Sequence, residues 1–266
     1  KHYFEKKIYK KGGYNPWSFC VTLKGNIVFL SDKNGYRGVN IFDPSGKQVR
    51  ENFITIKQDF RCQWRVIRMD SQGDVYIGTP LRKRGQMVQP EVQGRIPRYF
   101  GQVFDPKPYF YFHHYTGSVV KFSNSGALLS LEPDGEYIMT RTGSGMHYCK
   151  AKGVEWSHFG FSPKSLKETA GNTCECTQGS YDLDRFDRLF IPYSLLYSVQ
   201  VIDRNNNPIL RFGRYGNTNE KGLVFSWPRN VVVDDRYVYI GDSMNDRIVR
   251  GKLVYKKAEE CIINKE

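Results

Sequence analysis

The sequence lacks the long apolar runs and the short catalytic signatures that assign many proteins at once. No apolar stretch approaches the roughly 18–20 residues that a helix needs to cross a bilayer, so we expect no membrane span. The patterns C-x-x-C-H, G-x-S-x-G, H-E-x-x-H and G-x-x-x-x-G-K-[ST] are all absent. Their absence argues against covalently bound c-type haem, a serine-hydrolase elbow, a zincin site and a P-loop.

Acidic residues are also scarce relative to basic ones. The 266 residues include 40 Lys and Arg against 27 Asp and Glu, which gives a formal net charge of +13. This balance indicates either a solvated basic surface or an acidic or polyanionic partner, such as nucleic acid, an anionic surface or an acidic protein. The basic residues are spread along the chain, and the densest run is only Arg82-Lys83-Arg84. This even distribution weakens the case for a dedicated nucleic-acid site.

Cysteines are few and scattered, and no C-x-x-C pair occurs among them. They are Cys20, Cys62, Cys149, Cys174, Cys176 and Cys261. An even number is compatible with disulfides in an oxidising compartment, so we expect a soluble extracytoplasmic, secreted or periplasmic protein; buried thiols in a reducing compartment are the alternative. The chain starts at Lys1 rather than Met, and we interpret it as a processed or excised product.

What the sequence has instead is a repeated meander, clearest at 227–254. This stretch predicts strands at 230–233, 237–241 and 247–254, each rich in Val, Ile or Tyr, and the turns between them are rich in Asp, Asn and Ser. β-Branched and aromatic strands separated by such turns are typical of antiparallel meanders.

Three other stretches, 17–49, 64–79 and 179–212, repeat this pattern at a nearly constant period. Gly25 and Gly73 stand in the same relation to their strands and are 48 residues apart. This period is in the range expected for propeller blades, and the hydrophobic content of 39% favours a packed core over disorder.

The last repeat, with the form V-Y-I-G-D-S-x-N-x-R-I, closely resembles the NHL repeat, which is one blade of a β-propeller. The resemblance covers about 17–79 and 179–255 and is to the SMP-30/NHL-like six-bladed propellers. It implies an all-β fold, with one β-propeller domain over 1–266 and six four-stranded blades; five or seven blades are alternatives. The segments around 80–116 and 136–178 lack the repeat, so we expect irregular insertions there.

The two ends and the middle predict how the blades are completed. The last repeat has only three strands before the chain turns polar at Lys256, so we expect the strand at 3–9 to supply its fourth and close the ring. In the middle, 117–131 is expected to form the last two strands of one blade, joined by a hairpin turn at 123–126.

Metal binding is one hypothesis for a functional site. Cys62 and Cys176 occupy equivalent repeat positions, 114 residues apart, and Cys174 lies two residues before Cys176. Thiolates and imidazoles are metal ligands, so the candidate set is Cys62, Cys174, Cys176, His113 and His147. The spacing matches no standard zinc pattern, and disulfides or buried thiols are alternatives. We expect no cofactor, while a divalent metal is left open.

A partner-binding patch in the irregular middle is the second hypothesis. Aromatic and basic side chains concentrate there, and protein interfaces are enriched in Tyr, Trp, Phe and Arg. Packing between blades is the alternative. The candidate residues are Arg82, Lys83, Arg84, Tyr109, Tyr111, His114 and Trp156.

Propellers host enzymes and binding modules alike, and their sites are expected where loops enter the innermost strands. The favoured hypothesis is a non-enzymatic binding or scaffold domain that recruits a protein partner. The alternatives are a metal-dependent hydrolase or lyase of the six-bladed type and an RNA-binding NHL domain. The chain also resembles propeller accessory subunits of bacterial extracytoplasmic redox complexes, such as that of hydrazine synthase, which implies a place in a multisubunit complex.

Overall fold

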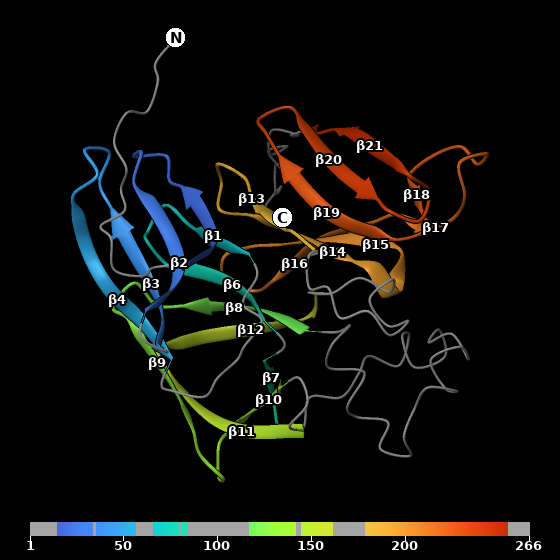
Figure 1. Ribbon diagram of the computed structural model, residues 1–266. Coiled ribbons are helices and arrows are strands. Elements are labelled where there is room, and N and C mark those ends of the chain that lie inside the picture. Colours follow the sequence, from blue (N-terminus) through green and yellow to red (C-terminus); the bar gives the residue numbers. More distant parts are fainter. Residues whose placement is uncertain are drawn as a thin grey trace, which may run out of the picture.

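The computed structural model describes residues 15–33, 36–56, 66–79, 81–84, 117–141, 145–161 and 179–254. In these ranges the chain is built almost wholly of β-strands, with a short 3-10 helix at Ser194–Leu196 (Figure 1). No helix in these ranges is long and apolar enough to span a membrane. The predicted all-β class is confirmed.

Three sheets are meanders whose strands pair in chain order. The first contains β1 (Asn15–Val21), β2 (Ile27–Lys33), β3 (Tyr36–Phe42) and β4 (Gln48–Ile56). The second contains β13 (Asp182–Leu183), β14 (Leu189–Tyr193), β15 (Ser198–Ile202) and β16 (Pro208–Phe212). The third contains β19 (Pro228–Val233), β20 (Tyr237–Asp242) and β21 (Arg247–Lys252). Between the last two, β17 (Arg214–Tyr215) and β18 (Val224–Phe225) form a small parallel pair.

Another four-stranded sheet departs from chain order. β5 (Ile67–Met69), β6 (Val75–Thr79) and β8 (Gly117–Phe122) pair in turn, but the strand beside β8 is β12 (Val154–Phe161). β9 (Ala127–Leu131) follows β8 in the chain and instead pairs with β4 and with β11 (Gly145–Lys152). The prediction that 117–131 forms a paired hairpin is therefore wrong.

Burial gives the physical reason for this exchange of strands. β12 ends in Phe159 and Phe161, which are 4% and 0% exposed, and the Phe161 ring packs edge-on against Tyr181 at 5.2 Å. β9 ends in Leu131, which is 40% exposed. Fully burying a large apolar side chain stabilises a fold by about 1.5–3 kcal/mol, so the aromatic strand takes the place beside β8.

The segments expected to be irregular contain regular strands. β10 (Tyr137–Arg141) lies between β11 and β7 (Arg82–Lys83). Together with β9 and β11 they form a four-stranded group that joins the first sheet through β4. β10 and β11 pair in chain order, but their outer partners, β7 and β9, do not follow the order of a meander.

A five-residue turn recurs between successive strands and carries the sequence period. It begins at Thr22, Asp43, Asp70, Asp184 and Asp203. In each turn the first residue exchanges backbone hydrogen bonds with the fourth and fifth, and the fourth residue has a positive φ of 58–89°. Glycine or Asn and Asp tolerate this conformation best, so the predicted equivalence of Gly25 and Gly73 is confirmed.

Apolar layers pack each sheet against the next. One layer lies between the β1–β4 and β5-β6-β8-β12 sheets, a second lies between the latter and β13–β16, and a third lies between β13–β16 and β19–β21. Successive antiparallel sheets stacked face to face in this way, with their first strands around a common axis, form a β-propeller. The number of six blades and closure by 3–9 depend on residues outside the described ranges and stay predictions.

Candidate functional site

The first strands of four sheets end around one cavity of about 630 Å3. Its lining comes from 19–24, 68–73, 182–185 and 233–235, where β1, β5, β13 and β19 lead into their turns. A concave site shared by the innermost strands lies on the propeller axis. The cavity lies at the end of the innermost strands from which the chain leaves. The sequence predicts a site at the opposite end, where loops enter these strands. The segments 57–65 and 162–178, which precede β5 and β13, lie outside the described residues.

Aspartates hold three of the turns that line the cavity. In Asp70, Asp184 and Asp234 one carboxylate oxygen accepts two backbone N–H groups of its own turn, at 2.6–3.0 Å. In Asp234 these backbone hydrogen bonds lower the pKa of the carboxyl group, which keeps it ionised. These carboxylates therefore fix the turns and supply negative charge.

An ion pair joins three blades beside the cavity. Arg68 Nε lies 2.6 Å from Asp182 Oδ1, and Asp182 Oδ2 accepts the backbone N–H of Val233 at 3.0 Å. The half-buried Cys20 lines the cavity next to this pair. Burial raises the pKa of the Cys20 thiol to about 11, because desolvation outweighs the nearby Arg68 charge. The thiol is therefore neutral at physiological pH and is a poor nucleophile or thiolate ligand.

The cavity wall combines an apolar strand with acidic turns. On β1 and its turn, Phe19, Val21 and Leu23 are 65%, 61% and 86% exposed. The other walls carry most of the charged lining, in which six aspartates face three cations, a formal net charge of −3. The aspartates are Asp70, Asp182, Asp184, Asp187, Asp234 and Asp235, and the cations are Lys24, Arg68 and Arg185. Asp184 is paired with Arg188 and Asp70 lies near Lys121 and Arg204. Asp187 and Asp234 instead accept hydrogen bonds from neutral groups, so these two carboxylates favour a cationic ligand there.

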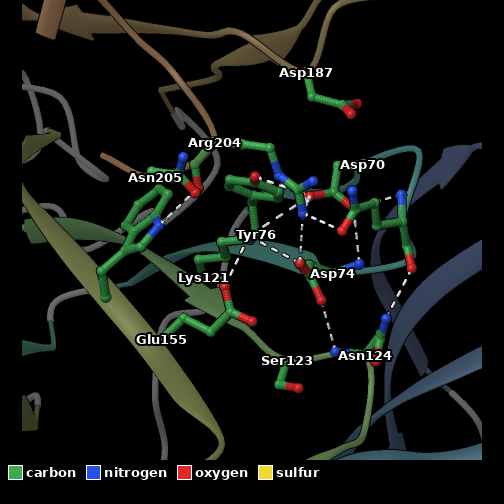
Figure 2. Close-up of polar contacts among 12 residues, drawn as sticks. Asp70, Asp74, Tyr76, Lys121, Ser123, Asn124, Glu155, Asp187, Arg204 and Asn205 are labelled. Carbon is green, nitrogen blue, oxygen red and sulfur yellow. Dashed lines mark hydrogen bonds and ion pairs between the residues drawn. The ribbon is translucent and has the colours of Figure 1, made fainter. Parts of the chain in front are cut away.

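A buried ionic cluster joins two sheets next to the cavity (Figure 2). Lys121, on β8, is 2% exposed, and its Nζ lies 2.8 Å from Asp74 Oδ2 and 2.8 Å from Glu155 Oε2. Burial alone would lower the pKa of Lys121, but the hydrogen bonds to Asp74 and Glu155 raise it. The ammonium group therefore stays charged and fixes β6, β8 and β12 together.

The same cluster reaches the neighbouring sheet through Arg204, from the β15–β16 turn. Its Nη2 lies 3.4 Å from Asp74 Oδ2 and donates to Gln72 Oε1 at 2.6 Å. Asp70 accepts a hydrogen bond from Tyr76 at 3.1 Å, and burial raises the pKa of Asp70. Lys121, Arg204, Asp74 and Glu155 are thus engaged with one another, and they hold the 70–74 turn beside the cavity, whereas Asp187 stands apart from them in Figure 2.

The predicted partner-binding residues do not gather at this cavity. Lys83 and Arg84 are exposed at the end of β7, where the Arg84 guanidinium lies 4.8 Å from the centre of the Tyr148 ring. Arg82 pairs with Ile138 in the sheet, and its side chain is not described. Tyr109, Tyr111 and His114 lie outside the described residues. For these three the partner-binding role stays a prediction.

Trp156 has a defined place between blades. It is half-buried, its ring lies 5.6 Å from the Tyr76 ring, and its Nε1 donates to the backbone oxygen of Arg204 at 3.0 Å. These contacts favour the packing alternative for this residue over an exposed partner patch.

The predicted metal set cannot be assembled from the described residues. His147 lies on β11 opposite Met139, and its side chain is not described. Cys62, Cys174, Cys176 and His113 lie outside the described ranges. Within those ranges no group of three or more His, Cys, Asp or Glu side chains is placed to hold a metal ion, so the metal hypothesis stays a prediction.

Sequence reasoning missed the cavity residues, although a signal for them was present. Asp70 and Asp184 are the same turn position in two repeats, 114 residues apart, and Arg68 and Asp182 share that separation. The spacing used to align Cys62 with Cys176 therefore also marks the ion pair beside the axis. The predicted metal ligands, which are cysteines and histidines, do not include this aspartate and arginine.

Comparisons with known proteins give no family. No protein-family model matches the chain, and no curated protein matches it. Solved structures that resemble it include a protein of unknown function from Bacteroides caccae, 11% identical over 91% of this chain and 62% of that chain, with a TM-score of 0.35. This chain therefore spans about three fifths of the length of that protein.

Two of the similar structures have described activities. Catalytically inactive virginiamycin B lyase from Staphylococcus aureus with quinupristin is 11% identical over 91% of this chain and 82% of that chain, with a TM-score of 0.28. A gluconolactonase from Xanthomonas campestris is 14% identical over 84% and 67% of the respective chains, with a TM-score of 0.29. At such values the likeness assigns neither an activity nor a site to this chain.

Proposed function

We propose that this chain is a non-catalytic β-propeller domain that binds a partner in the axial cavity. The observation that carries the proposal is the cavity of about 630 Å3 shared by four sheets, with exposed Phe19, Val21 and Leu23 along one wall. Exposed apolar side chains beside a concave site with a few fixed polar groups are typical of ligand and protein binding.

The use of the polar groups supports binding over catalysis. Asp70, Asp184 and Asp234 each hold a turn backbone, and Asp182 holds Arg68 and a backbone N–H group. General acid–base catalysis requires a group within reach of the substrate whose pKa lies near the working pH. Carboxylates fixed in this way suit electrostatic recognition better than proton transfer.

The ionic contacts between sheets support a scaffold role. Arg68–Asp182 and the Lys121–Asp74 cluster hold the cavity walls in one arrangement, and a rigid site loses less conformational entropy on binding. We propose that the domain serves as a recruiting subunit of a larger extracytoplasmic assembly. The metal-dependent hydrolase or lyase and the RNA-binding domain stay predictions from the sequence.

Site-specific photo-cross-linking tests the proposal. p-Benzoylphenylalanine replaces Leu23 in the cavity wall or, as a control, Ile248 on β21, which is 75% exposed and does not line the cavity. We expect an adduct with one partner, identified by mass spectrometry, from position 23 alone. Adducts of equal yield from both positions, or from neither, would contradict the proposal.

A cavity-filling variant makes this test specific. Val21→Trp enlarges a side chain of the cavity wall that is 61% exposed, and it should abolish the adduct from position 23 while the thermal unfolding curve stays cooperative. An adduct of unchanged yield in a folded Val21→Trp protein would place the partner elsewhere.

A further inference from the structure

β1 presents a strand edge with no sheet partner among the described residues. It is the terminal strand of its sheet and pairs with β2 alone. The N–H of Thr22 donates to the backbone oxygen of Asn26 at 2.9 Å. Because hydrogen-bonding direction alternates along an antiparallel strand, Cys20 and Thr22 face β2, and the backbone groups of Phe19 and Val21 face the cavity.

Two of the other innermost strands, β19 and β5, differ because their edges are bonded to a neighbouring blade. On β19 the N–H of Val231 donates to Ser180 at 2.9 Å, and that of Val233 donates to Asp182 at 3.0 Å. On β5 the N–H of Ile67 donates to Ser18 Oγ at 3.3 Å. An exposed strand edge is a template for another strand, and β1 offers such an edge, seven residues long, beside the cavity.

Side chains beside this edge define two chemical requirements for an occupant. Phe19, Val21 and Leu23 are more than half exposed, so they favour apolar groups opposite them. Across the cavity, Asp187 and Asp234 accept hydrogen bonds from neutral groups, Ser71 and the backbone N–H groups of the 234–237 turn. With the formal net charge of −3 of the lining, these carboxylates favour a cation.

We propose that the axial cavity binds an extended peptide segment of a partner protein, added as a strand to β1 and carrying apolar residues alternating with Lys or Arg. The inference rests on the proposed binding function and names its ligand class. Strand addition supplies main-chain hydrogen bonds, and the alternating side chains supply specificity. Polyanions are disfavoured in this cavity, although the net charge of the whole chain is +13.

Defined peptides test each part of the proposal by fluorescence anisotropy with the full chain. The probe is fluorescein-labelled, amidated Lys-Val-Lys-Val-Lys-Val-Lys; a second labelled peptide has Glu for Lys, and a third is N-methylated at every residue, which removes the backbone donors of both edges but keeps the charges. We expect the first to bind at least about tenfold more tightly than either of the others. Equal binding of the Glu peptide would overturn the charge requirement, and equal binding of the N-methylated peptide would overturn strand addition.

Two variants of the protein locate the binding. Val21→Pro removes a cavity-facing N–H while leaving the bonds to β2, and it should weaken the lysine peptide by about tenfold or more. Asp235→Lys should weaken it as well, whereas Asp246→Lys, an equal charge change in a turn that does not line the cavity, should not. Equal effects of the two lysine variants would overturn the placement in the cavity.

The cross-linking and peptide experiments together distinguish failure of the peptide ligand from failure of the binding function. A cross-link from position 23 without binding of any peptide would refute the peptide ligand and leave the binding cavity supported. Self-association by sedimentation that Leu23→Asp abolishes would assign the cavity to a second copy of this chain and overturn the proposal. Absence of both cross-link and peptide binding would refute the cavity as a site.

Discussion

Lys121 places an ammonium group at 2% exposure, between carboxylates from two different parts of the chain, the 70–74 turn and Glu155 (Figure 2). Removing one partner of a buried ion pair is costly because the remaining charges lose their compensation. Lys150 offers a matched contrast, since its Nζ also lies 2.8 Å from a carboxylate, that of Asp134, but both side chains are exposed. Exposed pairs contribute little because solvent screens them.

We therefore expect Lys121→Met to lower the free energy of unfolding by about 3 kcal/mol, because the buried Asp74 carboxylate loses its nearest cation, whereas Glu155 is partly exposed to solvent. Lys150→Met makes the same chemical change and should leave the urea midpoint almost unchanged. Urea denaturation followed by circular dichroism measures both. Equal losses in the two variants would show that Lys121 is not held in a buried cluster.

Cys20 gives a second residue-scale prediction, because its thiol has a pKa of about 11. The thiolate is the reactive form, and two pKa units above the ordinary value of 9.0 reduce its population about a hundredfold at neutral pH. We expect alkylation of Cys20, followed by peptide mass spectrometry, to be about that much slower in the folded chain than in urea. Its rate should rise with pH up to about 11, and a plateau near pH 9 would contradict this.

At the scale of strands, the same four letters occupy two different environments. V-Y-I-G spans 75–78 in β6 and 238–241 in β20. A Cβ at Gly78 would lie 2.6 Å from the Phe161 ring and 3.1 Å from Tyr181, whereas at Gly241 the nearest atom is Asn230 Cβ at 3.3 Å. β6 is therefore covered on this side by an aromatic layer that the sequence motif does not reveal.

Alanine at these two glycines tests the position of β12. Gly78→Ala should lower the free energy of unfolding by about 1–3 kcal/mol, because the Phe161 ring has to move within a filled layer. Gly241→Ala should cost clearly less, since the nearest atom would lie 3.3 Å away instead of 2.6 Å and has to shift by only a few tenths of an ångström. Chemical denaturation of both variants measures these losses of unfolding free energy. An equally large loss in Gly241→Ala would contradict the position of the aromatic layer over β6.

The sequence predicts a meander well where neighbouring strands follow one another in the chain. The strands of 230–254 were located within about two residues, because Val, Ile and Tyr runs and Asp-rich turns report local structure directly. The exchange of β9 for β12 beside β8 could not be predicted, since it depends on which distant strand brings Phe159 and Phe161 into the layer. The cavity also depends on contacts between distant segments, because it forms only where the turns of four blades lie side by side.

At the scale of the whole molecule, charge is distributed unevenly. The total of +13 indicates an acidic or polyanionic partner, yet the cavity lining has a formal net charge of −3. Composition sums charges without regard to position, so it cannot show that aspartates recur at turns which the fold brings to one axis. Binding of a polyanion, if measured, is therefore expected on surfaces other than the cavity, with affinity that falls steeply as salt is added.

The repeated turn aspartates also set how the molecule responds to acid. Hydrogen bonds from the Ser45 side chain and the Lys47 backbone lower the pKa of Asp43, and similar bonds lower those of Asp203 and Asp234. A carboxyl group with a lowered pKa in the folded state stabilises the fold above its ordinary pKa, near 3.8, and this contribution is lost as the pH falls through the lowered value. Asp70 has a raised pKa and opposes this trend, but the three aspartates with lowered pKa values outnumber it.

We accordingly expect a Tm that is nearly constant from about pH 5 to 7 and falls below about pH 4. Asp43→Asn isolates one contribution, because all three hydrogen bonds at this side chain are accepted by Oδ1, and an amide oxygen can accept them without the charge. Its Tm should lie below that of the parent chain at pH 6, and the two should converge as the pH falls through the lowered pKa of Asp43 and this carboxyl group becomes protonated. Calorimetric scans across this range measure the difference, and a gap that persists unchanged at low pH would show that the charge of Asp43 contributes nothing to the turn.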